Sequence, residues 1–397
     1  MNASVTTKPL RILKILDAIG QHPRGLNSED KDIALIKPLT SLRFFAALAV
    51  YIDHLGLQTD TGSLGVMFFF VLSGFIITYT YADKVNTLEP RGLASLYTKR
   101  IGRIFPVHLL TLLLAIPLVF ITDAPTTFTT GVYNALLMQS WYPSSSDFFS
   151  LNSVSWTLSV EWAFYLAFPF LMMAIKQFGF NKSAASGLML SGLCLAFLLA
   201  FTLWMYRDPA RVASSTWLIR ISPINLFIFL IGTGVALYLT QEKLSQRFSP
   251  GFATALEVIA LVLIAATYHW TVVDGGKDRM PLDHVILYLP LFAFCIYIFS
   301  VAKGLVSKML SNRLLVHLGN LSFSMYMLHL LAIIYTDRYL MPVIGANGVT
   351  LNRFYLFAML MIACEVVYRL VETPYRNYAR KAASNLFSRY NAATRPA

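Results

Sequence analysis

Arg43 and His54 are the first two residues of the chain whose types and spacing could support chemistry. They stand eleven positions apart in the mostly apolar stretch LTSLRFFAALAVYIDHLGL. At about 100° and about 1.5 Å per helical residue, they share one face and lie about 16 Å apart along the axis. An imidazole there could exchange a proton near neutral pH, and the guanidinium could hold an anion. Each residue alone could also be a polar group reaching towards lipid headgroups.

Arg100 and Arg103 form a second candidate group in the stretch YTKRIGRIF. Residues three apart are neighbours on a helix surface, so the two guanidiniums could hold phosphate groups together. The structural alternative is that both arginines anchor the helix at the cytoplasmic surface of a membrane.

Glu161 is a carboxylate five residues into the apolar run that begins at Trp156. Its depth is comparable to that of His54, and a carboxylate facing an imidazole could fix the tautomer and stabilise the imidazolium. We therefore predict Glu161 as the catalytic partner of His54. The alternative is that Glu161 binds the helix backbone or another polar residue.

Ser322, Tyr326 and His329 recur at helical spacing in LGNLSFSMYMLHL, which predicts one stripe pointing into the protein. His329 is either a buried core histidine or a second site residue. The remaining histidines show no HExxH or HxxEH spacing, so no metal site is expected. Glu365 and Arg369, four apart, are predicted to form an ion pair.

Composition indicates which elements must position these residues. Hydrophobic residues make up 56% of the 397 and charged residues only 13%. An average soluble domain carries about 25% charged residues, so a soluble globular protein is disfavoured. Ten apolar runs are long enough to be membrane spans. They lie at about 39–57, 64–82, 104–122, 156–175, 184–206, 221–239, 251–272, 284–302, 318–336 and 349–371.

The basic residues are distributed unequally between the two sides of these spans. With a cytoplasmic N-terminus, 23 Lys and Arg residues fall on the cytoplasmic side and 6 on the other. Because cytoplasmic loops retain basic residues, both termini are predicted to be cytoplasmic. This asymmetry explains the net charge of +12 without nucleic acid. The sequence therefore predicts an all-α, polytopic membrane protein with about ten transmembrane helices.

Three regions follow from these spans. Residues 1–38 are predicted to be a cytoplasmic segment, either a short interfacial helix or a disordered tail. Residues 39–372 form the transmembrane domain, and residues 373–397 a cytoplasmic C-terminal tail. Within the transmembrane domain, Gly65 and Gly74 lie in an apolar run, where glycines usually permit close helix packing.

In these motifs the sequence resembles the integral-membrane acyltransferase 3 family, over about residues 38–375. The motifs occur in family order as an Arg-x10-His pair, GVMFFFVLSGF, KRIGRIFP, NSVSWTLSVEWAFYLAFP and LGNLSFSMYMLH. They contain Arg43 and His54; Ser73 and Gly74; Arg100 and Arg103; Asn152, Trp156 and Glu161; and Ser322 and His329. Two departures from the family pattern are His108, where an aromatic residue often follows the arginine motif, and Phe323, which replaces a common tyrosine.

The resemblance implies transfer of an acyl group, usually acetyl, from cytoplasmic acyl-CoA to a hydroxyl of a surface polysaccharide, lipopolysaccharide or lipid-linked sugar. His54 would then be a general base or a transient acyl carrier. The three arginines 43, 100 and 103 would bind the donor. The substrate pore would be lined by Ser73, Asn152, Trp156, Ser322, Tyr326 and His329.

The resemblance also implies a bacterial inner membrane location, with membrane lipids as neighbours. Some members carry a fused extracytoplasmic esterase-like domain, which is expected to be absent here, so a second transfer step is expected to need a glycan-assembly partner protein. The alternative from another functional class is a transporter or flippase of a glycan or small molecule, although the sequence shows no inverted repeat.

Overall fold

The computed structural model describes residues 37–57, 59–82, 90–122, 126–141, 145–208, 222–241, 248–273, 281–340 and 349–393. The described residues contain helices and no strand, which confirms the predicted all-α class. The predicted interfacial helix in residues 1–38 lies outside the described residues, apart from 37 and 38, which begin the first helix.

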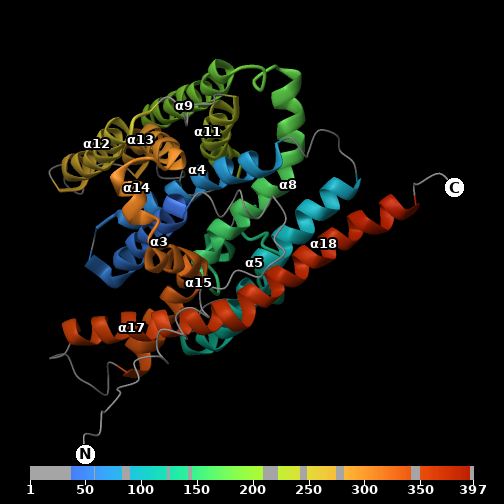
Figure 1. The fold of residues 1–397 in the computed structure, drawn as a ribbon. Helices are drawn as coiled ribbons and strands as arrows, with labels where there is room; N and C mark the ends of the chain where they lie inside the picture. Colours follow the sequence, from blue (N-terminus) through green and yellow to red (C-terminus); the bar gives the residue numbers. More distant parts are fainter. Residues whose placement is uncertain are drawn as a thin grey trace, which may run out of the picture. The chain divides into compact units, whose positions relative to one another are not determined.

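The ten predicted spans all correspond to helices (Figure 1). The first four of them are α3 (Lys37–Ile52), α4 (Thr61–Tyr81), α5 (Pro90–Thr122) and α8 (Trp156–Gln177). The next three are α9 (Ala184–Tyr206), α11 (Ser222–Gln241) and α12 (Pro250–Tyr268). The last three are α13 (Pro281–Val301), α15 (Arg313–Tyr335) and α17 (Val349–Val367), and α18 (Thr373–Ala393) follows them.

Shorter elements connect or extend these helices. Three of them are α6 (Phe128–Ala135), α7 (Ser145–Phe148) and α14 (Leu305–Leu310). A 3-10 turn, η2 (Ser153–Ser155), precedes α8, and four π-helical turns extend longer helices. These are η1 (Asp53–Leu57), η4 (His269–Val273), η5 (Thr336–Leu340) and η7 (Tyr368–Glu372).

Among the described residues, eight helices are long and apolar enough to cross a membrane. Two predicted spans fall short of that length. Helix α3 has 16 residues before the π-helical turn η1, and the apolar part of α13 covers Ile286–Val301. The structure therefore supports eight of the ten predicted transmembrane helices by their length and composition. The cytoplasmic placement of the termini stays a prediction.

Close backbone contact holds α4 against α11 near the centre of the protein. A side chain at Gly74 would place its Cβ 1.9 Å from the Phe229 carbonyl oxygen, and one at Gly232 would lie 1.8 Å from that of Val71. Only glycine fits at these two positions. Lipid is as apolar as a helix side chain, so close packing rather than the hydrophobic effect drives such association. The packing role predicted for Gly74 is confirmed.

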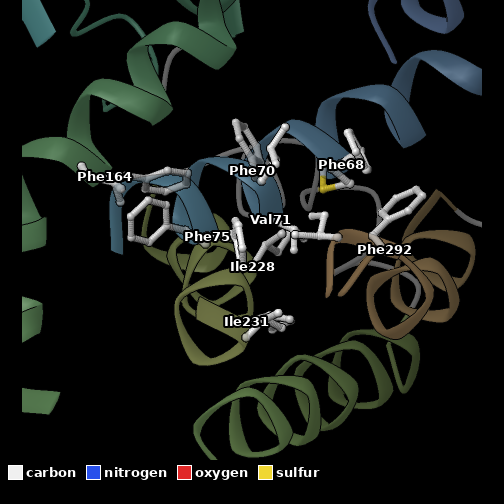
Figure 2. Packing of buried hydrophobic residues seen from close by; sticks show 14 of the residues in the cluster. Phe68, Phe70, Val71, Phe75, Phe164, Ile228, Ile231 and Phe292 are labelled. Atoms are coloured by element: carbon white, nitrogen blue, oxygen red, sulfur yellow. The ribbon is translucent and has the colours of Figure 1, made fainter. Parts of the chain in front are cut away.

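Aromatic side chains fill the space around this contact. Figure 2 shows phenylalanines of α4, α8 and α13 converging with aliphatic residues of α11. Phe70 of α4 meets Phe164 of α8 edge-on at a ring distance of 5.3 Å, and Phe68 meets Phe292 of α13 at 5.6 Å. Edge-to-face pairs at these distances stabilise the packing beyond the area that they bury. Helix α4 is thereby packed against α8, α11 and α13.

Candidate active site

His54 lies at the turn between α3 and α4, in the π-helical turn η1. Within this turn, Gly56 has a φ of 75°, a left-handed conformation that glycine adopts without strain. The Leu55 carbonyl accepts a hydrogen bond from Arg353 of α17 at 3.2 Å, which ties the turn to a second helix. The His54 side chain is exposed. The sequence placed His54 near the end of its span, and the structure agrees.

The hydrogen bonding of His54 selects its tautomer. Its Nδ1 lies 2.8 Å from the Val50 carbonyl oxygen. A carbonyl oxygen only accepts, so Nδ1 carries the proton, and in the neutral ring Nε2 has the free lone pair. An imidazole in this state can remove a proton or attack a carbonyl carbon through Nε2.

His329 of α15 is the ring beside His54. The two ring centroids are 5.0 Å apart at an angle of 70°. His329 is fully buried, and its Nδ1 donates to the Tyr326 carbonyl at 2.7 Å. Its Nε2 is buried without a hydrogen-bond partner. The two histidines therefore share one arrangement, with Nδ1 held by a carbonyl of their own helix.

The predicted stripe on α15 does point into the protein. Ser322, Tyr326 and His329 are all buried, which confirms that interpretation. The Tyr326 hydroxyl shares a 2.8 Å hydrogen bond with Thr157 at the start of α8. Ser322 Oγ is buried without a partner. We call His54, His329, Tyr326 and Thr157 the histidine region.

Asn152 and Trp156 flank this region. The Asn152 side-chain amide donates to the Met327 carbonyl at 2.9 Å, joining η2 to α15, and its Oδ1 is buried without a partner. Trp156 packs on Phe148 at a ring distance of 5.3 Å and edge-on against Phe70 at 6.3 Å. Trp156 therefore supports the wall of the region through packing.

Glu161 belongs to a different group of side chains. Its Oε1 accepts a 2.6 Å hydrogen bond from Ser73 of α4 and another from Tyr165, one turn further along α8. Glu161 also interacts electrostatically with Arg43 and Arg100. Ser73 and Glu161, both predicted as site residues, are thus brought together by the packing of α4 on α8.

Arg100 lies inside this group. Only 5% of the residue is exposed, and its guanidinium stacks on the rings of Tyr165 at 4.9 Å and Tyr81 at 5.3 Å. Its Nε is buried without a hydrogen-bond partner. A headgroup anchor would be exposed, so this burial favours a binding role over the anchoring alternative. We call Arg43, Arg100, Arg103 and Glu161 the arginine region.

The contacts of the described residues do not include the expected pair of Glu161 and His54. The Val50 carbonyl holds the imidazole instead, and the carboxylate accepts from Ser73 and Tyr165. Glu161 and His54 do not meet because their helix faces contact different helices. Similar depth in two spans does not bring two side chains together unless their faces meet, and the Glu161 face meets α4 and α5.

Glu161 nevertheless connects the two regions, because it interacts electrostatically with Tyr326 as well as with Arg100. Thr157 of the histidine region and Glu161 of the arginine region also stand four residues apart on α8, so the two regions adjoin on one face of that helix.

Two residues that interact with the arginine region, Tyr165 and Glu372, were missed by the sequence analysis. Tyr165 stands four residues after Glu161, a spacing that places both on one helix face and could have revealed it. Glu372 is 3% exposed and accepts a 2.9 Å hydrogen bond from Ser324. It interacts electrostatically with Arg43 and Arg103. Its sequence signal, a carboxylate just past the last apolar run, is weak.

Four further titratable residues outside the two regions make contacts that join helices or turns. The predicted ion pair of Glu365 and Arg369 is confirmed, and His317 Nε2 also contacts Glu365 at 2.7 Å. Buried His108, one of the departures from the family pattern, bonds through Nε2 to the Asn134 carbonyl at 2.8 Å and so joins α5 to α6. Within the described residues, no three His, Cys, Asp or Glu side chains gather as a metal site would require.

Comparison with known proteins gives a family for this arrangement. The sequence profile of the family described as "Acyltransferase domain" matches residues 37–369. This match covers α3 to α17 and both regions of the candidate site. No solved structure matches the chain.

Three curated relatives are similar to the chain over most of its length. Acyltransferase MdmB of Streptomyces mycarofaciens is 28% identical, over 77% of this chain and 81% of its own. O-acetyltransferase OatA of Staphylococcus aureus is 25% identical, over 87% of this chain and 58% of its own. A putative O-acetyltransferase of S. aureus is 26% identical, over 89% of this chain and 59% of its own. The chain thus spans a little over half the length of these last two relatives.

Proposed function

The chain belongs to this acyltransferase family, and from that premise we propose that it is an O-acetyltransferase of the bacterial inner membrane. The proposed donor is acetyl-CoA on the cytoplasmic side. The proposed acceptor is a hydroxyl of a surface polysaccharide, lipopolysaccharide or lipid-linked sugar. Family membership favours this enzyme over the transporter or flippase alternative.

One observation carries the proposal: the arginine region and the histidine region are separate but adjoining. Acyl-CoA has two ends of different chemistry, a set of phosphates and a thioester. Arg43, Arg100 and Arg103 supply guanidiniums, which bind phosphates through paired hydrogen bonds. Buried Arg100 stacks on aromatic rings, which fixes the direction of its donors. Thr157, which bonds Tyr326, lies one turn before Glu161 on α8 and brings the two regions next to each other, so we expect the acyl end to reach the imidazoles.

His54 Nε2 is the proposed reacting atom, because the Val50 carbonyl leaves it as the basic nitrogen. In one route, Nε2 takes the proton of the acceptor hydroxyl while the oxygen attacks the thioester carbon and the thiolate leaves. In the other, Nε2 attacks the thioester carbon and releases the thiolate, and the acceptor oxygen then attacks the acetyl carbon and releases the free imidazole. Both routes yield the acetyl ester, the free thiolate and one proton.

The proposed function is tested with purified protein in detergent and acetyl-CoA labelled in the acetyl group. With a panel of bacterial oligosaccharides, we expect label on the glycan. Without acceptor, label on His54 selects the acyl-histidine route, and unlabelled protein selects the general-base route. Detergent removes any vectorial transport, so a transporter would leave acetyl-CoA intact. Intact acetyl-CoA with every acceptor would overturn the assignment.

A further inference from the structure

Helix α18 follows the segment matched by the family profile and lies along α5, as Figure 1 shows. The two helices meet at Gly102, where an added Cβ would lie 2.2 Å from the Ala379 side chain. Gly102 is next to Arg103, and Ala379 is three residues beyond Arg376. The contact between the helices therefore has an arginine of the candidate site on one side and Arg376 on the other.

Two acid–arginine pairs of the same spacing stand near this point, and their environments differ. Glu365 and Arg369 have 27% and 54% of their side chains exposed, and His317 also contacts the carboxylate. Glu372 and Arg376 have 4% and 25% exposed. The π-helical turn η7 contains Arg369 of the first pair and Glu372 of the second, and its wider turn changes the helix face that follows it. The second pair is consequently turned towards the interior.

Charge is unbalanced around Glu372. This buried carboxylate is close enough to interact with Arg43, Arg103 and Arg376, so three cations share one anion. Adding Arg100 and Glu161 gives four cations against two anions. Partly buried charges without partners are unfavourable, so the surplus favours an anion at this place.

Contacts orient the Arg376 guanidinium but leave part of its hydrogen-bonding capacity unused. It lies 3.8 Å from Glu372, longer than the 2.7–2.9 Å of a strong charged hydrogen bond. It also contacts the Tyr368 hydroxyl at 3.5 Å and stacks near the Tyr368 ring, 5.7 Å from the centroid. Its Nε is buried without a hydrogen-bond partner. Ser324 fixes Glu372 from the side of α15.

From these contacts we propose that Arg376 binds a phosphate group of the acyl donor and that Glu372, held by Ser324, orients it. The donor site then includes α18, beyond the residues that the family profile matches. This inference rests on the proposed function, because it assumes a donor that carries several phosphates.

The test compares Arg376→Gln with Arg369→Gln in the full-length protein purified in detergent. Each variant removes one arginine four residues after a glutamate, but only Arg376 belongs to the proposed site. Binding of coenzyme A is measured by calorimetry at low and moderate salt. We expect about a tenfold weaker affinity for Arg376→Gln and a change of less than about twofold for Arg369→Gln. Screening by salt should weaken binding less in Arg376→Gln than in wild type.

Arg376→Lys is a second variant for the case in which Arg376→Gln does not fold, as judged by gel filtration. It keeps the charge but loses the planar fork, so we expect affinity between those of wild type and Arg376→Gln. The inference would be overturned if folded Arg376→Gln bound coenzyme A with wild-type affinity. If Arg376→Gln does not fold, wild-type affinity in Arg376→Lys would overturn it. So would an equal loss in Arg369→Gln, because it would indicate a general charge effect.

Binding of inorganic pyrophosphate separates failure of this inference from failure of the proposed function. If wild-type protein binds pyrophosphate but not coenzyme A, the proposed donor is wrong. A weaker pyrophosphate affinity in Arg376→Gln would still support a phosphate site at Arg376. If wild type binds coenzyme A, and Arg376→Gln binds coenzyme A and pyrophosphate as tightly as wild type does, only the inference fails.

Discussion

The histidine region and the arginine region are built by different kinds of contact. In the first, each imidazole is held by a backbone carbonyl three or four residues earlier in its own helix. In the second, Glu161 accepts from Ser73 on another helix, and Arg100 stacks on rings from α4 and α8. The orientation of the proposed reacting nitrogens is therefore fixed by contacts within one helix, whereas the positions of the binding groups depend on how four helices pack. This difference predicts which kinetic constant each substitution should change.

His54→Ala should have the largest effect. Removing a general base or nucleophile typically costs about 10²–10⁴-fold in rate, so we expect kcat to fall about 10³-fold. Coenzyme A affinity should not change, because the arginines are intact. His269→Ala, on a different helix, is the control and should keep wild-type kcat. A His54→Ala protein that acetylates at the wild-type rate would show that this region is not the reaction centre.

Arg100→Ala combined with Arg103→Ala should act on the donor instead. Charged hydrogen bonds contribute about 1.5–3 kcal/mol each, so losing both arginines should raise KM for acetyl-CoA by at least about 100-fold. The change in kcat should be much smaller. Arg313→Ala removes an exposed arginine at the start of α15 and serves as the control. An unchanged KM in the double variant would return these residues to the role of membrane anchors.

His329→Asn sharpens the comparison within the histidine region. The asparagine amide can still donate to the Tyr326 carbonyl, but the ring and its Nε2 are lost. We expect kcat to fall about tenfold without a change in coenzyme A affinity. Steady-state kinetics with calorimetry separates the two quantities. A rise in KM alone would place His329 with the donor-binding residues.

Tyr165→Phe should have the smallest effect. It removes the hydroxyl that donates to Glu161 but keeps the ring on which Arg100 stacks. Because Ser73 still donates to the same carboxylate oxygen, we expect a net cost of only about 1 kcal/mol and a rise in KM for acetyl-CoA of about fivefold. Tyr97→Phe, a tyrosine that donates instead to the Leu166 carbonyl, is the matched control. A loss confined to kcat would mean that Glu161 acts in the reaction rather than in donor binding.

Local sequence spacing predicted much of this protein. All ten apolar runs are helices, and the Ser322, Tyr326 and His329 stripe is buried as its period indicated. Ion pairing of Glu365 with Arg369 also followed from a spacing of four. These features succeed because a helix relates residues by a fixed rotation and rise, whatever lies around it.

Contacts between helices could not be predicted in the same way. Glu161 and His54 have comparable depths, yet Glu161 meets Ser73 and Tyr165. Depth in a membrane is one coordinate, and the rotation of each helix about its axis is another that hydropathy leaves open. Figure 2 shows aromatic side chains packed around α4, and packing of this kind selects the rotation of a helix.

The sequence by itself determined the all-α membrane class and the residues that could do chemistry, and it predicts the basic asymmetry between the two sides. Only the tertiary structure decided how those residues are grouped. Two near-identical acid–arginine pairs make this clear, because Glu365 with Arg369 is half exposed and Glu372 with Arg376 is turned inward. The physical reason is the π-helical turn η7 together with the packing of α18 on α5, a contact between residues distant in sequence.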